Sequence, residues 1–465
     1  MIEHMKSLAL VFLVTASIIQ TLLLWYSSPS YQDNRITAFE DIPQIGHKDF
    51  KKHEIHELAA PPEILVHSKG KHQRILPSEA HQTLVEKLHH AQLENLNEIT
   101  PSSARWERLI NKESGLEFRF HHELPTGVIK GFFKGKETIP EEIENINRIW
   151  VFGEGDQNRV TIWLISDRTQ TVTQATALIQ DYKSLLNSAK QAGSTALLPF
   201  YKGEKPGLKK EDITEETIPR ITYLPKKRLK VPHLTYKLEQ IKVEHMKMIL
   251  FRNPNYVKKT ELSDQSFIYT ELESLRNLRY DEKKKNMIYK NTGTESETSL
   301  PHVKELNTIN AFMDRHNGWT GNYLLQSVEQ DKNNNLNNYR FQLYVEGMPV
   351  FGPDNLPGFD TIRLVASQRV TEYERSLFFS PSRSEIKKPD YLPSAEEVFD
   401  SLKKQNLNLS DIQQIYPGYQ AATEKKQLKL KPVWVVIFDN EKQGFLEISD
   451  TGRGTQWTGA KPNPS

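Results

Sequence analysis

The stretch RIWVFGEGDQNRVTIWLIS, residues 148–166, shows most clearly how this chain folds. Apolar residues fill both of its ends, from Trp150 to Phe152 and from Val160 to Leu164, while Gly, Asp and Asn occupy the middle. Two short apolar runs separated by turn-forming residues are typical of a β-hairpin. The stretch therefore predicts two antiparallel strands.

Neighbouring segments predict further strands and helices around this hairpin. In GLEFRFHHEL, residues 115–124, apolar and polar residues alternate with the period of a half-buried strand. A helix is predicted to open at Ser78, and a second one from about Thr173, with an apolar face that continues to Ala189 and a C-cap at Gly193. Together these elements predict an α+β domain that closes near residue 200.

Beyond residue 200 one pattern occurs three times. KGEKPGLKKEDITEETIPR, residues 202–220, is charged, contains Pro and Gly, and is typical of a linker. Helices are then predicted near 241–251, 301–319 and 394–407, the last with Ser394 as its N-cap, and each is followed by antiparallel strands. Such a helix packs across one face of the sheet that its strands form.

The N-terminal stretch from Leu8 to Tyr26 carries no charged side chain. As a helix it is roughly 28 Å long, close to the ~30 Å hydrocarbon core of a bilayer, whereas the apolar part of a signal peptide has about 7 to 15 residues. The Ser-Pro-Ser of residues 28–30 is a poor cleavage site, so a retained anchor is favoured over a signal peptide. Trp25 and Tyr26 end the run as membrane-interface anchors.

The charges that flank this run predict its orientation. Lys6 and the free amino group precede it, and Arg35 is the only cation in the first fifteen residues after Tyr26. We therefore expect a cell-membrane protein with a single span, a cytoplasmic N-terminus and an extracytoplasmic bulk.

One face of the predicted helix carries Leu13, Ser17, Gln20, Thr21 and Leu24. Ser17 and Thr21 form a small-xxx-small pair, and the amide of Gln20 seeks a hydrogen-bond partner in lipid. One interpretation is a transmembrane face that binds partner helices. The other is that Gln20 lies among the outer headgroups and bonds to water or lipid.

These observations predict an α+β fold: a single N-terminal transmembrane helix followed by three extracytoplasmic domains of antiparallel sheet packed with helices. The expected parts are a cytoplasmic stub with the anchor (1–28), an N-terminal domain (29–204), a central domain (205–298) and a C-terminal domain with a polar tail (299–465).

Composition excludes several classes of protein. The net charge is +2, so we predict no nucleic-acid partner. The hydrophobic fraction of 37% is enough for real cores and argues against a disordered chain. The chain has no cysteine, which excludes disulfides and a lipid-modified N-terminal Cys.

Fragments of catalytic motifs are present but incomplete. Residues 450–452 read Asp-Thr-Gly, yet an aspartic protease needs two such carboxylates and the chain has one copy. Residues 401–404 and 384–387 match SxxK without the companion motifs, and 153–155 lacks the third glycine of a dinucleotide loop. We predict no catalytic residue, no cofactor and no enzyme.

Eight of the 15 histidines fall between His47 and His90. Pairs such as His53 with His56, or His89 with His90, could contribute imidazoles to a zinc or copper site. No Asp or Cys joins them at recurrent spacing. We therefore expect a polar N-terminal region in which histidines face water, and no metal site.

Five stretches together resemble one known family by their order and spacing. They are LLLWYSSPSY (22–31), SLRNLRYDEKKKNMIYKN (274–291), HNGWTGNYLLQSVEQ (316–330), YRFQLYVEGMPVFG (339–352) and LKPVWVVIF (430–438). The chain in this respect resembles the YycH family, membrane-anchored accessory proteins of the essential WalK/WalR (YycG/YycF) two-component system in low-GC Gram-positive bacteria. The tail after Ile448 is longer than expected of this family.

The resemblance implies a single-pass protein with three outer domains, the last two similar to those of the sister protein YycI. It implies partners as well: a YycI-like membrane protein and the sensor histidine kinase WalK (YycG), which the membrane helix is held to touch in the family. A homo-oligomer is a further arrangement that stays open. The expected function is regulation of a kinase of cell-wall homeostasis through protein–protein contacts.

Two other functions remain as alternatives. An extracytoplasmic module that binds a cell-wall ligand would use Trp319, Tyr323 and Tyr344 as aromatic platforms, although the alternation in YRFQLYV favours core packing for such residues. A wall hydrolase has the least support, because no paired acids stand at a recognisable site.

Overall fold

The structure is a computed structural model of the 465-residue chain and divides into two compact units, Met1–Ile42 and Pro43–Ser465. In the first unit, residues 12–21 are helical. The residues that the structure describes are 6, 10, 12–21, 43–46, 53–76, 78–134, 139, 144–153, 158–193, 195–201, 205–206, 218–271, 275–291, 293, 299–331, 336–353, 355–380, 386–407, 409–438, 442–448 and 455–462.

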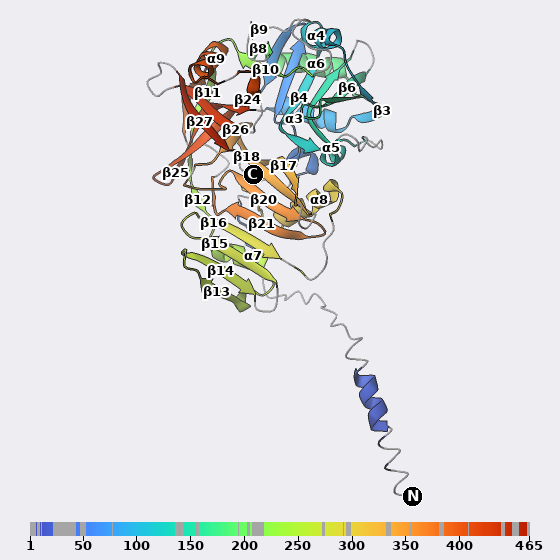
Figure 1. Ribbon diagram of the computed structural model, residues 1–465, viewed down its shortest axis with the longest axis vertical. Coiled ribbons are helices and arrows are strands. Elements are labelled where there is room, and N and C mark those ends of the chain that lie inside the picture. The colour runs from blue at the N-terminus through green and yellow to red at the C-terminus, as the bar shows by residue number, and fades with distance from the viewer. Residues whose placement is uncertain are drawn as a thin grey trace. The chain divides into compact units, whose positions relative to one another are not determined.

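A ten-stranded antiparallel sheet, the first sheet, begins the second unit (Figure 1). Its order is β10-β8-β2-β1-β4-β5-β6-β7-β3, with β9 beside β8. Its strands are β1 (Glu63–Ser68), β2 (Lys71–Ile75), β3 (Gln92–Ile99), β4 (Ser114–Pro125), β5 (Asn145–Phe152), β6 (Arg159–Ser166), β7 (Thr171–Leu178), β8 (Thr195–Tyr201), β9 (Lys205–Pro206) and β10 (Ile221–Pro225). The predicted hairpin is confirmed, because β5 pairs with β6 and places Trp150 opposite Trp163.

Helices cover both faces of the first sheet. They are α2 (Ile55–Leu58), α3 (Glu79–His89), α4 (Ser103–Asn111), α5 (Thr126–Phe132) and α6 (Tyr182–Ala192). Leu84 of α3 belongs to the same cluster as Val66 of β1, whereas Trp106 of α4 packs with Leu65 on the opposite face. Successive strand residues point to opposite faces, so β1 contributes to both layers of core. The N-cap at Ser78 is confirmed by its acceptance of the His81 N–H.

The start of the second predicted helix is wrong. Residues 171–178 form strand β7, and α6 begins only at Tyr182. The segment TVTQATAL alternates buried and less buried residues and is rich in threonine. Pairing with both β6 and β3 favours the extended form of such a sequence. The helical spacing of apolar residues further along the chain does not reveal these neighbours.

The rest of the second unit forms a fifteen-stranded sheet, the second sheet, and a small pair, β12 with β22. Its strands are β11 (Leu229–Lys237), β13 (Val257–Glu261), β14 (Ser266–Glu271), β15 (Arg276–Asp281), β16 (Asn286–Asn291), β17 (Asn322–Gln330), β18 (Asn337–Val345), β19 (Met348–Phe351), β20 (Thr361–Ala366), β21 (Val370–Ser376), β23 (Ile386–Leu392), β24 (Ile412–Glu424), β25 (Gln427–Phe438), β26 (Lys442–Ile448) and β27 (Thr455–Pro462); the pair is β12 (Glu239–Gln240) and β22 (Phe378–Phe379). The pairing of β19 with β24 is parallel.

Three helices accompany these strands, as the repeated pattern predicted. They are α7 (Val243–Leu250), α8 (His302–Asp314) and α9 (Ala395–Lys404), with short 3-10 turns at Pro254–Tyr256 and Leu409–Asp411. The predicted N-cap at Ser394 is confirmed, and Glu397 completes a capping box with it. Leu306 and Ile309 of α8 are fully buried against the sheet.

The C-terminal tail also differs from expectation. Residues 455–462 form strand β27, which pairs with β26. A Cβ atom at Gly444 would collide with the indole of Trp457, so the glycine makes room for this side chain. The sequence predicts only a polar tail here, because the alternation of residues 455–462 is weak and Trp457 is their single large aromatic residue.

Strand pairing joins the regions predicted as central and C-terminal domains. β16 pairs with β21, with Tyr289 opposite Tyr373, and β11 pairs with β25. Both regions therefore belong to one sheet, while the predicted domain boundaries remain a prediction.

The first described residues of the second unit lie against residues far along the chain. Ile45 donates its N–H to the carbonyl oxygen of His316 at 3.0 Å. The side chain of Asn310 donates to the carbonyl oxygen of His53 at 2.5 Å. The segment before the first sheet is thus held by α8 and the turn that follows it.

Candidate functional site

The predicted partner face lies partly within the described helix. Leu13, Ser17, Gln20 and Thr21 belong to residues 12–21, and their side chains are exposed. The Thr21 hydroxyl donates to the Ser17 carbonyl oxygen at 2.8 Å, which places these two small residues one turn apart. The other predicted residues, Leu24 of this face and the interface anchors Trp25 and Tyr26, lie outside the described residues.

The helix is apolar around much of its circumference. Its exposed large side chains include Leu10, Phe12, Val14, Ile18 and Ile19, each more than half exposed. Within the described part of the chain, no helix has both the length and the apolarity needed to cross a membrane.

The SxxK fragment at 401–404 is placed by α9. Ser401 is buried in the core beside Leu402, and Lys404 is exposed at the end of the helix. The second fragment, 384–387, the Asp-Thr-Gly of 450–452 and the turn glycine Gly155 fall wholly or partly outside the described residues. Ser401 therefore packs as a small core residue.

The histidines before residue 90 do not all face water, contrary to expectation. His67 and His72 are buried within the first sheet, because β1 and β2 lie in its interior. His56 and His89 are also buried, with their rings stacked at a centroid distance of 4.0 Å, and His56 Nε2 lies 3.0 Å from Glu86 Oε2. Among the described residues, no group of three or more His, Cys, Asp or Glu side chains is arranged to hold a metal ion.

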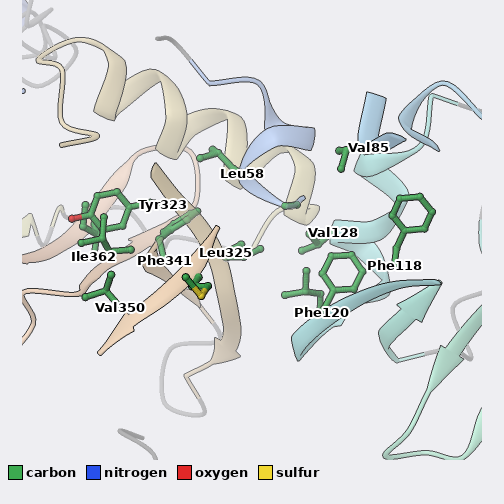
Figure 2. Close-up of a cluster of buried hydrophobic side chains, with 14 of the residues drawn as sticks. Leu58, Val85, Phe118, Phe120, Val128, Tyr323, Leu325, Phe341, Val350 and Ile362 are labelled. Atoms are coloured by element: carbon green, nitrogen blue, oxygen red, sulfur yellow. The ribbon is translucent and has the colours of Figure 1, made fainter. Parts of the chain in front are cut away.

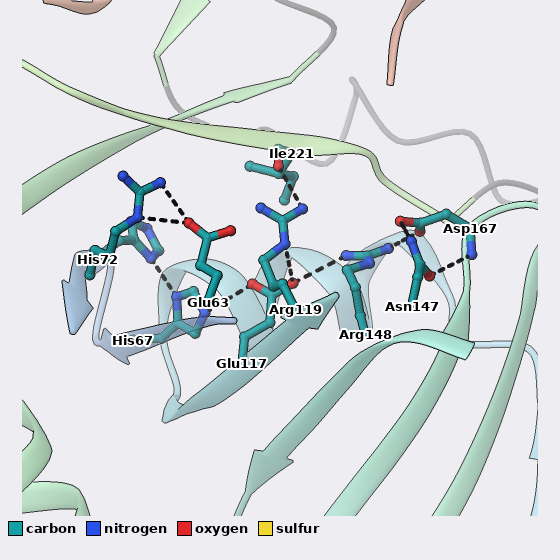
Figure 3. A network of polar contacts seen from close by, with 10 residues as sticks. Glu63, His67, His72, Glu117, Arg119, Asn147, Arg148, Asp167 and Ile221 are labelled. Atoms are coloured by element: carbon teal, nitrogen blue, oxygen red, sulfur yellow. Dashed lines mark hydrogen bonds and ion pairs between the residues drawn. The ribbon is translucent and has the colours of Figure 1, made fainter. Parts of the chain in front are cut away.

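A set of buried polar side chains, here called the buried charge network, crosses β2, β1, β4 and β5 (Figure 3). Its members are Glu63, His67, His72, Arg74, Glu117, Arg119, Asn147, Arg148 and Asp167. Arg74 binds Glu63 at 2.7 Å, and Arg148 binds Asp167. Glu117 lies between Arg119 and Arg148, at 3.4 and 3.5 Å.

The hydrogen bonds of this network determine which atoms carry protons. Burial alone would raise the pKa of Glu117, but Arg119, His67 and Arg148 together lower it to about 2. The ionised carboxylate accepts from His67 Nε2 at 3.2 Å, and the Nδ1 atoms of His67 and His72 lie 2.7 Å apart. Burial lowers the pKa of His72 to about 3, so the His72 ring is neutral near pH 7.

The arrangement suits stabilisation better than chemistry. Three arginines balance three acids, Glu63, Glu117 and Asp167, and Glu117 is fully buried. A carboxylate with a low pKa and no access to solvent is a poor general acid or base. The alternation of residues 115–124 had placed Glu117 and Arg119 on a solvent face, and this is wrong because α4 and β10 cover that face.

The first and second sheets meet through aromatic and apolar side chains. His121 of β4 stacks on Tyr416 at 3.8 Å between ring centroids and lies 3.0 Å from the Tyr344 hydroxyl. Figure 2 shows Val128 and Leu58 beside Leu325 in the apolar cluster that continues between the sheets. This cluster fixes the two sheets in contact.

Two glycines of α5 allow a close approach to α8. A Cβ on Gly127 would lie 2.6 Å from His302 Cδ2, and one on Gly131 would lie 2.5 Å from Val303 Cγ2. The Gly-x-x-x-Gly spacing of residues 127–131 is the sequence signal for this close approach, because residues four apart share one helix face.

The aromatic platforms proposed for a cell-wall ligand are not available on the surface. Trp319, Tyr323 and Tyr344 are buried, with exposed fractions of 2%, 3% and 7%. Trp319 Nε1 donates to Asn310 Oδ1 at 3.0 Å. These rings therefore belong to the core, as the strand alternation had indicated.

Two models of one protein family match successive parts of the chain. Residues 3–194 match the family model "YycH protein, N-terminal domain", and residues 220–445 match "YycH protein, C-terminal domain". The crystal structure of YycH from Bacillus subtilis is similar in fold, with a TM-score of 0.66 and 18% sequence identity over 87% of this chain and 98% of that chain. A search of curated proteins found no matching relative.

Proposed function

The chain belongs to the YycH family, and from this membership we propose that it is a membrane-anchored regulator of the essential WalK (YycG) sensor histidine kinase. It modulates the kinase through protein–protein contacts, together with a YycI-like membrane protein. The observation that carries the proposal is the match of both family domains, in order, along most of the chain.

The exposed apolar helix supports the membrane part of the proposal. Residues 12–21 expose Leu13, Ile18 and Ile19 to more than half of their surface, a state that water disfavours. Lipid or partner helices would cover these side chains. The helix would continue through Leu24 to the interface anchors Trp25 and Tyr26, with the N-terminus in the cytoplasm and the second unit outside.

The polar residues of this helix suggest how it recognises a partner. The Thr21 hydroxyl already donates to the Ser17 carbonyl oxygen within the helix, so it does not require an acceptor on another chain. Gln20 brings an amide with two N–H groups and one oxygen, which lipid tails cannot bind. The face of Leu13, Ser17, Gln20, Thr21 and Leu24 is therefore the proposed contact with kinase, YycI-like or identical helices.

Substitutions on this face test the proposal. Ser17→Leu separates the helix backbones, and Gln20→Leu removes a hydrogen bond worth about 0.5 to 2 kcal/mol. Each is expected to weaken association two- to thirtyfold while the chain still inserts, because leucine keeps the run apolar. Ile18→Leu, on another face, is the matched control.

Co-purification from detergent, at equal membrane levels, measures the effect. Cysteine crosslinking in intact cells, at single positions between residues 8 and 26, shows whether the kinase and the YycI-like protein touch this face. If all three variants retain the partners equally, recognition resides in the outer domains. If neither partner co-purifies with the unchanged chain, the regulatory proposal itself fails.

A further inference from the structure

A cavity of about 470 Å³, here called the polar cavity, opens on the second sheet. Its walls include Asn286, Gln326, Asn338, Arg340, Phe351 and Arg363. The volume lies within the range of about 300 to 1,000 Å³ typical of small-molecule sites.

Strand alternation places polar residues on this wall. In β18, Tyr339 and Phe341 are fully buried, and the Tyr339 hydroxyl donates to Glu305 of α8 at 2.6 Å. Asn338 and Arg340 alternate with them and therefore point away from α8. The polar cavity is thus built on strands whose other face is core, a rigid base for a binding site.

The wall carries charges of both signs, because Glu329, Asp360 and Glu374 line the cavity together with Arg340 and Arg363. Arg363 binds Glu372 at 2.8 Å and Glu374 at 2.9 Å. Arg340 stands directly opposite Arg363 in the pairing of β18 with β20, and like charges at opposed positions destabilise a sheet. Among the described residues, the side chain of Arg340 makes no hydrogen bond or ion pair, although Asp360 interacts with it electrostatically. Burial raises the pKa of Asp360, and the charge of Arg340 opposes this rise.

Several side-chain amide oxygens around the cavity also lack partners, although the amide nitrogen of Gln326 lies 3.2 Å from His122 Nε2. The side-chain oxygens of Asn286, Gln326 and Asn338 are buried without a hydrogen bond to any described residue. Gln326 is the extra residue of a β-bulge between Leu325 and Ser327, and bulges commonly re-aim side chains next to binding sites. Buried amides without partners are costly unless another group bonds to them.

We propose that the polar cavity binds a small carboxylate-bearing ligand whose adjacent hydroxyl or amide groups donate hydrogen bonds to Asn286, Gln326 and Asn338, while the carboxylate binds Arg340. A guanidinium group forms two parallel hydrogen bonds with a carboxylate, which makes Arg340 the specific anchor. The ring of Phe351 supplies an apolar wall. Acidic amino sugars and peptide C-termini share this chemistry at the required size.

Calorimetric titration of the full chain in detergent distinguishes these sources. The probes are N-acetylmuramic acid as the acidic sugar, N-acetyl-D-alanyl-D-alanine as the peptide, and N-acetylglucosamine as the sugar without a carboxylate. At least one acid is expected to bind in the micromolar to millimolar range, and N-acetylglucosamine at least tenfold more weakly. Absence of binding by both acids, or equal binding of the neutral sugar, overturns the proposal.

Variants locate the site. Arg340→Gln is expected to weaken binding of whichever acid binds by at least tenfold. Arg340→Lys should weaken it less, because lysine keeps the positive charge but cannot form two parallel hydrogen bonds with a carboxylate. Arg279→Gln removes an exposed arginine of β15, paired with Asp264, and is the matched control that should bind normally. Equal affinities of Arg340→Gln and the unchanged chain contradict the assignment.

A measurement on the unchanged chain avoids any dependence on how the variants fold. Phenylglyoxal modifies accessible guanidinium groups, and Arg340 is partly exposed. A saturating acid probe should slow modification of Arg340, measured by peptide mass spectrometry, but not that of Arg279. Modification of Arg340 at an unchanged rate overturns the proposal. These outcomes do not involve the kinase, so they stand apart from the test of the regulatory function.

Discussion

The buried charge network and the polar cavity both place charged side chains side by side on antiparallel strands. They differ in their access to solvent, because the network is buried and the cavity is open. In the network, each buried charge has a partner of opposite sign. Glu117 has Arg119 and Arg148 beside it, and water does not reach it. At the cavity, Arg340 faces Arg363 with no described acid bonded to it. A sheet can leave a charge uncompensated only where solvent or a ligand reaches it.

The largest difference between the two regions is expected when one acid is removed from each, because the loss in free energy of unfolding depends on burial. Glu117→Gln leaves Arg119 without its nearest carboxylate in the core, while Arg148 keeps Asp167, and is expected to lower the free energy of unfolding by about 3 to 5 kcal/mol. Glu374→Gln, whose partner Arg363 keeps Glu372, should lower it by about 1 kcal/mol or less. Urea unfolding followed by tryptophan fluorescence measures both. Equal losses would mean that the network is not closed to solvent.

Acid should lower the stability of the fold through its buried histidines. Burial lowers the pKa of both His72 and His316 to about 3, so each folded ring stays neutral while the unfolded ring binds a proton below pH 6.5. Their contribution is full above pH 6.5 and declines as the pH falls towards 3. At pH 5 each is expected to cost about 2 kcal/mol.

Urea midpoints between pH 7.5 and pH 5 measure this slope. His72→Gln should flatten it, because the variant has lost one group that titrates. His90→Gln, at a half-exposed ring, is the control and should leave the slope unchanged. A slope unaffected by His72→Gln would assign the acid sensitivity to other groups.

The smallest effect is expected at Asp360. Its pKa is raised, chiefly by burial, so the folded state holds the proton more tightly than the unfolded state does. Stability therefore falls as the pH rises past 3.8, and the charge is unfavourable near pH 7. Asp360→Asn should raise the free energy of unfolding by about 0.5 kcal/mol at pH 7, and the gain should shrink towards pH 4. Asp400→Asn, at an exposed position of α9, is the control. A net loss of stability in Asp360→Asn would show that the carboxylate is stabilising.

Sequence patterns predicted the fold class and most elements because each carries its own local signal. The 148–166 hairpin has two apolar arms and a polar turn, and Ser394 with Glu397 marks the start of α9. β7 was missed because its threonines suit a strand only when β6 and β3 flank it. Local spacing does not reveal such neighbours.

The candidate sites were less predictable, for a physical reason. Glu117 and Arg119 have the alternation of a solvent face, and only the packing of α4 and β10 over them shows that they are buried. The polar cavity depends on the order β16-β21-β20-β18-β17 within the second sheet, which the pairing of strands sets and local spacing does not reveal. The partner face of the N-terminal helix was readable because helical spacing alone defines it, and it remains a prediction.

The hydrogen bond from the Ile45 N–H to the His316 carbonyl oxygen cannot form until the ribosome has made residue 316. The partner of Ile45 is made 271 residues later, and ribosomes add about 5 to 20 residues per second, so roughly 14 to 54 s pass before this bond can form. The first sheet can pair its own strands during that interval, but the segment before it cannot reach its final place. We therefore expect the segment that precedes the first sheet to dock onto α8 only after the first sheet has formed, a closure over long sequence separation that folds slowly.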